Sequence, residues 1–177
     1  MKPPPIQAAS IELVVFDVDG VITDGGIIFH GIEGEMKRFD SQDGMGFTLA
    51  REGGLKVGIL TGRTSPMVER RARELSAAVI KQGFARKKEG WRQILQELDL
   101  PPERVAFMGD DIQDLPVLRL AGLSAAPSSA VPEVLAEVDY VCRRAGGHGA
   151  ARELIDLILS ARGSKAAAVA AVTQASE

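Results

Sequence analysis

The chain has 177 residues, of which 45% are hydrophobic and 25% charged, a length and composition that favour one globular domain with a single core. The 21 lysine and arginine residues against 24 aspartate and glutamate residues give a formal net charge of -3, so no large basic field is available to bind nucleic acid or an anionic membrane. Cys142 is the only cysteine, which excludes an internal disulfide and a cysteine-built zinc site. A secreted disulfide scaffold is therefore excluded.

The two ends of the chain differ in composition from the middle. Residues 1–10 contain a proline cluster and lack the apolar core of a signal peptide, and residues 163–177 are rich in alanine with few large apolar side chains. We expect both ends to be flexible and residues 11–162 to form the domain. No stretch reaches the ~20 apolar residues that cross a bilayer, so we expect a cytoplasmic protein without a membrane partner.

Between these ends, short apolar runs alternate with helical patterns. The apolar runs read as strands and lie at residues 13–16, 55–60, 79–80, 105–108 and 140–141. A helix is predicted to begin at Ser65-Pro66, and Trp91, Ile94 and Leu95 have the spacing of one buried helix face. This alternation predicts an α/β fold with a parallel sheet, which places ligands at the carboxyl ends of its strands. Residues 24–40 interrupt the alternation and predict a projecting β-hairpin.

Two aspartates follow the first predicted strand. Asp17 and Asp19 point the same way in an extended segment, and crowded carboxylates repel each other unless a cation or a shared proton intervenes. A hard cation such as Mg²⁺ relieves that repulsion and leaves one carboxylate oxygen free to attack an electrophile. The alternative is a strand-to-turn junction that uses aspartate and Gly20 for backbone reasons alone.

Three other strand ends carry polar groups. Thr61-Gly62-Arg63 offers a hydroxyl and an open backbone amide suited to phosphate oxygens. The basic run 86–88 follows the weak strand at 79–80 and could neutralise phosphate, although such runs are usually solvated. The acidic run 109–114 could complete a metal site, although one of its acids could instead cap a helix.

These segments together resemble a known family. The four motifs are similar, in order, to those of haloacid dehalogenase superfamily phosphatases, and they are Asp17-Val18-Asp19-Gly20-Val21, Thr61-Gly62-Arg63, Lys87 and Gly109-Asp110-Asp111-Ile112-Gln113-Asp114. Further segments resemble the cap-less 3-deoxy-D-manno-octulosonate 8-phosphate phosphatases, namely the hairpin, residues 39–46, Gln82-Gly83 and residues 145–153. The resemblance implies a Rossmann-like parallel sheet sandwiched by helices, without a cap domain.

The resemblance also implies a mechanism. Asp17 would be the nucleophile that forms an aspartyl-phosphate, and Asp19 the acid and base that protonates the leaving sugar oxygen and activates water. Mg²⁺ would be bound by Asp17, the backbone carbonyl of Asp19 and Asp110. Thr61 and Gly62 would hold the phosphoryl oxygens, while Lys87 offsets charge in the transition state. Counting from Gln82-Gly83 favours Lys87 over Lys88 for that position, and Asp111 and Asp114 are assigned to support.

Matching positions that contact the sugar acid in the family are Asp40, Ser41, Gln42, Asp43, Gly44, Thr48, Arg63 and Arg71, with Asp19, Gly62 and Lys87 closer to the phosphate. The pattern departs from the family at residues 40–42, at Thr48 and at His148, positions where relatives often carry asparagine or basic residues. Fewer cations therefore line the expected sugar pocket. Arg71 could equally be an ordinary exposed helix arginine.

Members of the family are tetramers whose hairpins assemble so that a neighbouring subunit covers each active site, and the hairpin here implies the same homotetramer. We expect hydrolysis of 3-deoxy-D-manno-octulosonate 8-phosphate for lipopolysaccharide synthesis. The alternatives are a phosphatase for nine-carbon sialic-type sugar acid 9-phosphates and a non-catalytic regulatory module. A phosphomutase is disfavoured because no inserted cap is visible to exclude water. His30 and Cys142 receive no catalytic role, and Trp91 is expected in the core.

Overall fold

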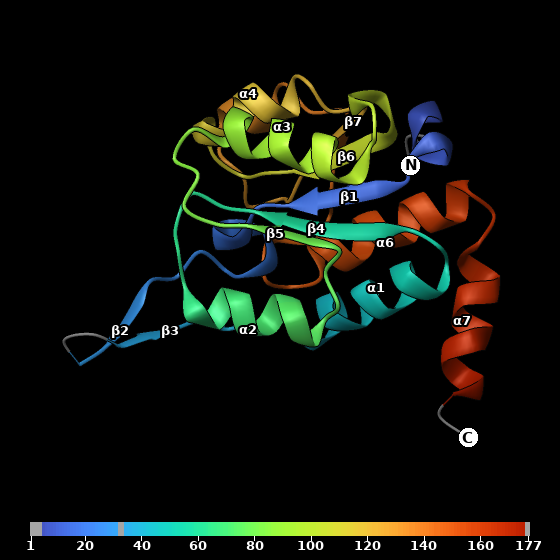
Figure 1. The fold of residues 1–177 in the computed structure, drawn as a ribbon, viewed down its shortest axis with the longest axis horizontal. Coiled ribbons are helices and arrows are strands. Elements are labelled where there is room, and N and C mark those ends of the chain that lie inside the picture. Colours follow the sequence, from blue (N-terminus) through green and yellow to red (C-terminus); the bar gives the residue numbers. More distant parts are fainter. Residues whose placement is uncertain (1–4, 32–33, 176–177) are drawn as a thin grey trace.

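The computed structural model describes residues 5–31 and 34–175 of the chain. Its centre is a six-stranded parallel sheet in the order β5-β4-β1-β6-β7-β8 (Figure 1). These strands are β1 Leu13–Phe16, β4 Lys56–Leu60, β5 Val79–Lys81, β6 Val105–Met108, β7 Leu123–Ala126 and β8 Tyr140–Val141. All residues of β1, β6 and β7 are buried, as expected for central strands covered on both faces.

Helices cover both faces of the sheet (Figure 1). They are α1 Ser41–Glu52, α2 Pro66–Glu74, α3 Lys87–Leu98, α4 Leu115–Leu118, α5 Pro132–Leu135, α6 Ala150–Ala161 and α7 Lys165–Gln174. Helices α1, α2 and α6 bury their apolar sides in one hydrophobic cluster, and α3, α4 and α5 in a second cluster on the opposite face. The predicted α/β fold, a parallel sheet between two helical layers, is confirmed.

The five predicted strands are present with small shifts at their ends, and the sequence prediction missed the sixth. Strand β7 has the sequence Leu-Ser-Ala-Ala, whose small side chains have low strand propensity. It forms because β6 and β8 pair with it on both sides and because all four residues are buried. The predicted helices are α2, with Ser65 at its N-cap position and Pro66 in its first turn, and α3, with Trp91 in the core.

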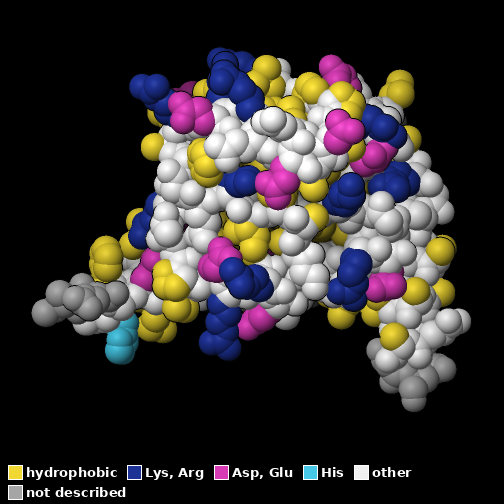
Figure 2. Space-filling model, viewed as in Figure 1, with side chains coloured by type: hydrophobic (Ala, Val, Ile, Leu, Met, Phe, Trp, Pro, Cys, Tyr) yellow, Lys and Arg dark blue, Asp and Glu magenta, His cyan; other side chains and the backbone are white. Residues whose placement is uncertain are grey.

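The predicted hairpin consists of antiparallel strands β2 Ile28–His30 and β3 Gly34–Met36, and its turn residues 32 and 33 lie outside the described residues. It projects from the end of the molecule at which the sheet strands terminate (Figure 1). The space-filling view shows the hairpin and the C-terminal helix protruding on opposite sides of the body (Figure 2). Apolar side chains stay exposed on the hairpin, and Phe29 has 76% of its surface accessible. The described residues contain no inserted cap.

The two ends are more ordered than the sequence suggests. Residues 6–10 form a 3-10 helix that buries Ala8, while residues 1–4 are outside the described part of the chain. The expected flexible tail instead contains helix α7, which packs against α1 and buries Ala168 completely. Small alanine side chains let the helices approach closely, so docking does not need large apolar residues. Within the described residues, no helix has the length and apolar character required to cross a membrane.

Candidate active site

The predicted chemical groups lie at the carboxyl ends of three neighbouring strands. Asp17 follows β1, Thr61 follows β4, and Asp110 comes two residues after β6. The parallel register pairs Phe16 at the end of β1 with Ile59 on one side and Met108 on the other. Three segments that are distant in sequence are therefore brought together by strand pairing alone.

Three carboxylates and one lysine form the centre of this site. Oxygens of Asp17, Asp110 and Asp114 all lie within 4.8 Å of one another. The Lys87 ammonium lies 2.9 Å from Asp17 Oδ1 and 2.5 Å from Asp114 Oδ1. The side chain of Lys87 is 1% exposed, whereas Lys88 is on the surface, so the structure brings Lys87 and not its neighbour to Asp17.

The charges in this cluster do not balance. Burial raises the pKa of Asp17, with Lys87 opposing the shift and Asp114 reinforcing it. Burial and the charges of Asp17 and Asp114 raise the pKa of Asp110 to about 7. Burial alone would lower the pKa of Lys87, but the two carboxylates it contacts outweigh this effect and raise it. Three ionised carboxylates around one ammonium leave an excess of negative charge in a buried place.

The cluster fits a hard divalent cation. Asp110 Oδ1 is buried and has no hydrogen-bond partner among the described residues, so one oxygen is left for another ligand. The donors are carboxylate oxygens, the ligand type preferred by Mg²⁺. Asp114 is occupied by other contacts, because it binds Lys87 and accepts hydrogen bonds from the backbone amides of Asp110 and Asp111. Asp111 is exposed and caps the short 3-10 helix Ile112–Asp114.

The loop after β1 has an unusual backbone that depends on glycine. Residues Val18–Ile22 form a turn with non-helical backbone angles at Asp19 and Gly20, closed by the hydrogen bond from the Thr23 amide to the Val18 carbonyl. Gly20 has φ of +84°, and a Cβ there would lie 2.0 Å from Asp110 Oδ2. A Cβ on Gly146 would lie 1.7 Å from the Gly20 carbonyl oxygen. The glycine-rich segment near residue 146 therefore packs directly against the loop that carries Asp17 and Asp19.

The segment after β4 provides groups suited to an oxyanion. Thr61 is buried, and its amide and carbonyl are used by backbone hydrogen bonds to Lys81 and Phe84. No hydrogen bond among the described residues uses the Gly62 amide, which leaves it available to a ligand. Arg63 is exposed, and its Nε lies 3.9 Å from Asp19 Oδ2.

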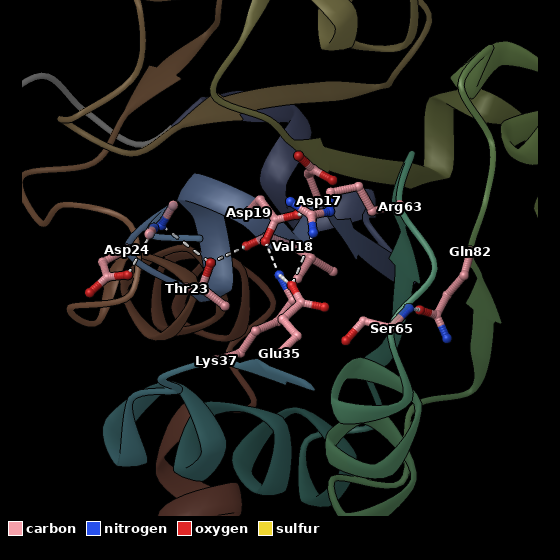
Figure 3. A network of polar contacts seen from close by, with 12 residues as sticks. Asp17, Val18, Asp19, Thr23, Asp24, Glu35, Lys37, Arg63, Ser65 and Gln82 are labelled. Carbon is pink, nitrogen blue, oxygen red and sulfur yellow. Dashed lines mark hydrogen bonds and ion pairs between the residues drawn. The ribbon is translucent and has the colours of Figure 1, made fainter. Parts of the chain in front are cut away.

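Sequence reasoning missed the nearest partner of Asp19, which comes from the hairpin. Lys37, directly after β3, places its Nζ 2.5 Å from Asp19 Oδ1 and 3.0 Å from Glu35 Oε1 (Figure 3). Glu35 also accepts a hydrogen bond from Arg63 at 3.2 Å. The Lys37 contact is the main cause that lowers the pKa of Glu35. The hairpin thus contacts the loop after β1 in its own chain.

Two of the predicted sugar-binding residues accept hydrogen bonds from backbone amides of the protein. Asp40 caps α1 by accepting from the amides of Gln42 and Asp43. Asp43 is 3% exposed, and its two oxygens accept from the amides of Gly149 and Arg152 at the start of α6. Burial raises the pKa of Asp43 despite these bonds. Its carboxylate is therefore already used to join α1 to α6.

The other predicted pocket residues lie on α1 and α2. Ser41 and Gln42 are exposed, Gln42 accepts a hydrogen bond from Arg144, and Thr48 is half-buried. Arg71 of α2 is packed against Gly44, where a Cβ would lie 2.5 Å from its Nη2, and its guanidinium carbon stands 6.0 Å from the centre of the Phe39 ring. Nε of Arg71 is buried without a hydrogen-bond partner among the described residues.

The remaining residues of interest lie outside the carboxylate cluster. His148 Nε2 lies 3.0 Å from Arg38, which is paired with Asp24 at the base of the hairpin. His30 lies on exposed strand β2. Cys142 is buried, and burial raises the pKa of its thiol, consistent with a core residue and not with a nucleophile.

The fold and the candidate site together define the class of protein. The parallel α/β sheet, the buried aspartate after β1, the threonine after β4, and the lysine and acidic loop beside them are the arrangement of a haloacid dehalogenase-like hydrolase, and the sequence model of that family matches residues 44–122.

Comparison with individual relatives identifies a family within this class of hydrolases. The chain is 42% identical over 158 residues to the 3-deoxy-D-manno-octulosonate 8-phosphate phosphatase of Escherichia coli K12, covering 89% of this chain and 84% of that protein. The crystal structure of the Yersinia pestis phosphatase of the same name superposes with a TM-score of 0.88 at 39% identity, covering 90% of this chain and 86% of that one. The Moraxella catarrhalis phosphatase of this name, solved in complex with magnesium ion, phosphate ion and KDO, has a TM-score of 0.90 at 36% identity, covering 94% and 95% of the two chains. The chain belongs to the 3-deoxy-D-manno-octulosonate 8-phosphate phosphatase family.

Proposed function

We propose that the protein is a Mg²⁺-dependent phosphomonoesterase that hydrolyses 3-deoxy-D-manno-octulosonate 8-phosphate to the free sugar acid and phosphate. The observation that carries this proposal is the buried Asp17 carboxylate at the end of β1, which contacts the Lys87 ammonium and lies within 4.8 Å of carboxylate oxygens of Asp110 and Asp114. Its relatives at 42% identity, which carry the name of this phosphatase, support the substrate.

The proposed reaction has two steps. One Asp17 oxygen attacks phosphorus and the bond from phosphorus to the sugar oxygen breaks, which leaves an aspartyl-phosphate. Asp19 donates a proton to the departing sugar oxygen, and it then takes a proton from the water that attacks the aspartyl-phosphate, releasing phosphate and restoring Asp17. Asp17 is suited to the first role because it is held by Lys87, and Asp19 to the second because it is partly exposed.

The other residues bind and stabilise the phosphoryl group in this proposal. Thr61 and the unused amide of Gly62 hold its oxygens, and Lys87 offsets negative charge in the transition state. Mg²⁺, when bound by Asp17, Asp110 and the backbone carbonyl of Asp19, supplies further positive charge to the phosphoryl oxygens. Asp114 and Asp111 keep Lys87 and the acidic loop in place.

We propose that the sugar acid is recognised beside this centre. Arg63 and Arg71 offer guanidinium groups for its carboxylate, and the unpartnered Nε of Arg71 is one such donor. Ser41, Gln42, Gly44 and Thr48 complete the pocket, with Asp40 and Asp43 contributing through the fold of α1 and α6.

We further propose a homotetramer in which hairpins of neighbouring chains meet near the active sites. The exposed apolar side chains of Ile28, Phe29 and Met36 support this assembly, because isolated hairpins seldom present such a surface to water. The released sugar acid would serve lipopolysaccharide synthesis.

Phosphate release by the purified protein tests the activity. The substrates are 3-deoxy-D-manno-octulosonate 8-phosphate, a nine-carbon sugar acid 9-phosphate and p-nitrophenyl phosphate, each with Mg²⁺ and with EDTA. We expect Mg²⁺-dependent release with preference for the eight-carbon ester, and no release by Asp17→Asn, which keeps the side-chain volume but removes the nucleophile. Preference for the nine-carbon ester would change the substrate, whereas no release from any ester would refute the phosphatase.

A further inference from the structure

The hairpin carries a buried ammonium group for which the proposed reaction has no role yet. The side chain of Lys37 is 1% exposed, and buried ammonium groups are rare unless they are paired. Its partners are Asp19 at 2.5 Å and Glu35 at 3.0 Å (Figure 3). The same arm of the hairpin, strand β3 and the residue directly after it, therefore supplies both the lysine and one of the carboxylates that hold it.

Asp19, Glu35 and Lys37 form a set of four interacting charged residues with Arg63. Arg63 Nη2 binds Glu35 Oε1 at 3.2 Å, and Arg63 Nε stands 3.9 Å from Asp19 Oδ2. When both carboxylates are ionised, two cations and two anions alternate around the set and it is neutral, and when Asp19 carries the proton that it donates, the set has one positive charge. Each oxygen of Asp19 consequently faces a different cation, Oδ1 the lysine and Oδ2 the arginine.

The two cations hold Asp19 unequally. Lys37 is within hydrogen-bond distance and almost fully buried, whereas Arg63 is 41% exposed and lies at 3.9 Å. A buried charged hydrogen bond fixes a side chain more firmly than an exposed ion pair, which solvent and salt weaken. The orientation of the Asp19 carboxylate therefore depends chiefly on Lys37.

We propose that Lys37 is a positioning residue that orients the Asp19 carboxylate for proton transfer, so that the hairpin of each chain is part of its own active site. The inference rests on the proposed function, because it assumes that Asp19 moves the proton. A proton donor must lie within hydrogen-bond reach of the leaving oxygen, and small displacements of a catalytic group reduce the rate strongly.

A comparison of esters with poor and good leaving groups distinguishes this role of Lys37 from a purely structural one. A sugar alkoxide is a poor leaving group that needs a proton as its bond to phosphorus breaks, whereas p-nitrophenolate leaves readily without one. The ratio kcat/KM reports the steps up to cleavage of the ester, before the aspartyl-phosphate is hydrolysed. Loss of Asp19 orientation should therefore lower kcat/KM for the sugar phosphate selectively.

The experiment compares Lys37→Met with wild type on 3-deoxy-D-manno-octulosonate 8-phosphate and p-nitrophenyl phosphate. We expect kcat/KM to fall by on the order of 10- to 100-fold for the sugar phosphate, less than the roughly 100- to 10,000-fold effect of a general acid because Asp19 itself is kept, and by less than about 3-fold for the aryl phosphate. Lys56→Met is the matched control, because Lys56 is exposed at the start of β4, the end of that strand away from Thr61, and we expect it to leave both values unchanged.

A second variant covers the case in which Lys37→Met does not fold. The double variant Glu35→Gln with Lys37→Met removes one charge of each sign and leaves Asp19 with Arg63, so no additional net charge is buried. We expect it to fold, to bind Mg²⁺ by calorimetry as wild type does, and to show the same selective loss on the sugar phosphate.

The outcomes separate the two proposals. Equal losses on both esters, or no loss on either, with an active wild type would overturn the role of Lys37 and leave the phosphatase standing. Loss of Mg²⁺ binding in the double variant would equally overturn it, since Lys37 would then act on the metal site. A wild type that is inactive on every ester refutes the proposed function and this inference with it.

Discussion

The buried lysine between two carboxylates allows a direct test of how the site is stabilised. Lys87→Met keeps a long unbranched side chain but removes the ammonium group that lies 2.9 Å from Asp17 and 2.5 Å from Asp114. All three side chains are at most 2% exposed, so water cannot replace the lost charge. We expect the free energy of unfolding to fall by about 3–5 kcal/mol at pH 8 without metal, the usual effect of removing one partner from a buried ion pair.

Urea denaturation in EDTA, followed by far-UV circular dichroism, measures this change. Lys88→Met is the matched control, because the neighbouring side chain is exposed, and it should alter stability by no more than about 0.5 kcal/mol. Adding Asp114→Asn to Lys87→Met removes one of the uncompensated charges and should restore part of the loss. Equal stability of the two lysine variants, or a double variant less stable than Lys87→Met, would refute the idea that Lys87 compensates buried charge.

The same reasoning predicts a dependence on pH. The pKa of Asp110 is raised to about 7 in the folded protein, above its value in the unfolded chain, so the folded state binds this proton more tightly. This group therefore destabilises the fold as the pH rises through the interval from about 4 to about 7, and its effect is constant above that interval. In metal-free protein, the gap between Lys87→Met and wild type should be largest above pH 7 and shrink in acid, as titration at several pH values will show.

Three further variants or reagents test other parts of the structure. Gly20→Ala should abolish Mg²⁺ binding by calorimetry, because a Cβ there would lie 2.0 Å from the Asp110 carboxylate; unchanged affinity would contradict the packing. Asp43→Ala should cost about 2–4 kcal/mol in urea denaturation, since one buried and one part-buried amide at the start of α6 lose a charged acceptor, and a loss below about 0.5 kcal/mol would count against this role. Cys142 should react with iodoacetamide at pH 8 only after unfolding, and rapid labelling of the native protein would show that the thiol is accessible.

The centre of the site could be predicted from sequence because it depends on strand ends. A short apolar run precedes each of Asp17, Thr61 and Asp110. Parallel pairing of the strands brings the ends of these runs together, whatever the conformation of the loops between them. The family resemblance, counted from Gln82-Gly83, favoured Lys87 over Lys88, and in the structure helix α3 begins at Lys87 and the Lys87 side chain contacts Asp17.

Other features depend on contacts that no local pattern specifies. Lys37 resembles any charged residue in an exposed hairpin until the hairpin folds back on Asp19. The Asp43 side chain binds backbone amides at the start of helix α6, more than 100 residues later, a contact that the family resemblance, which suggested a substrate contact, did not indicate. Strand β7 and helix α7 were missed for a related reason, because their small residues gain burial from neighbours and not from their own propensity.

Burial makes the active centre costly to fold and chemically useful for the same reason. A carboxylate cluster far from water is unstable by itself, so the protein surrounds it with Lys87, with the amides that bind Asp114, and with glycines that let the loop after β1 lie against Asp110. Oriented groups of this kind need little rearrangement when charge develops on a phosphoryl group. Asp19 differs, because it lies at the edge of the cluster and its carboxylate binds Lys37 of the hairpin, so the proposed mechanism places proton transfer where hairpin and sheet meet.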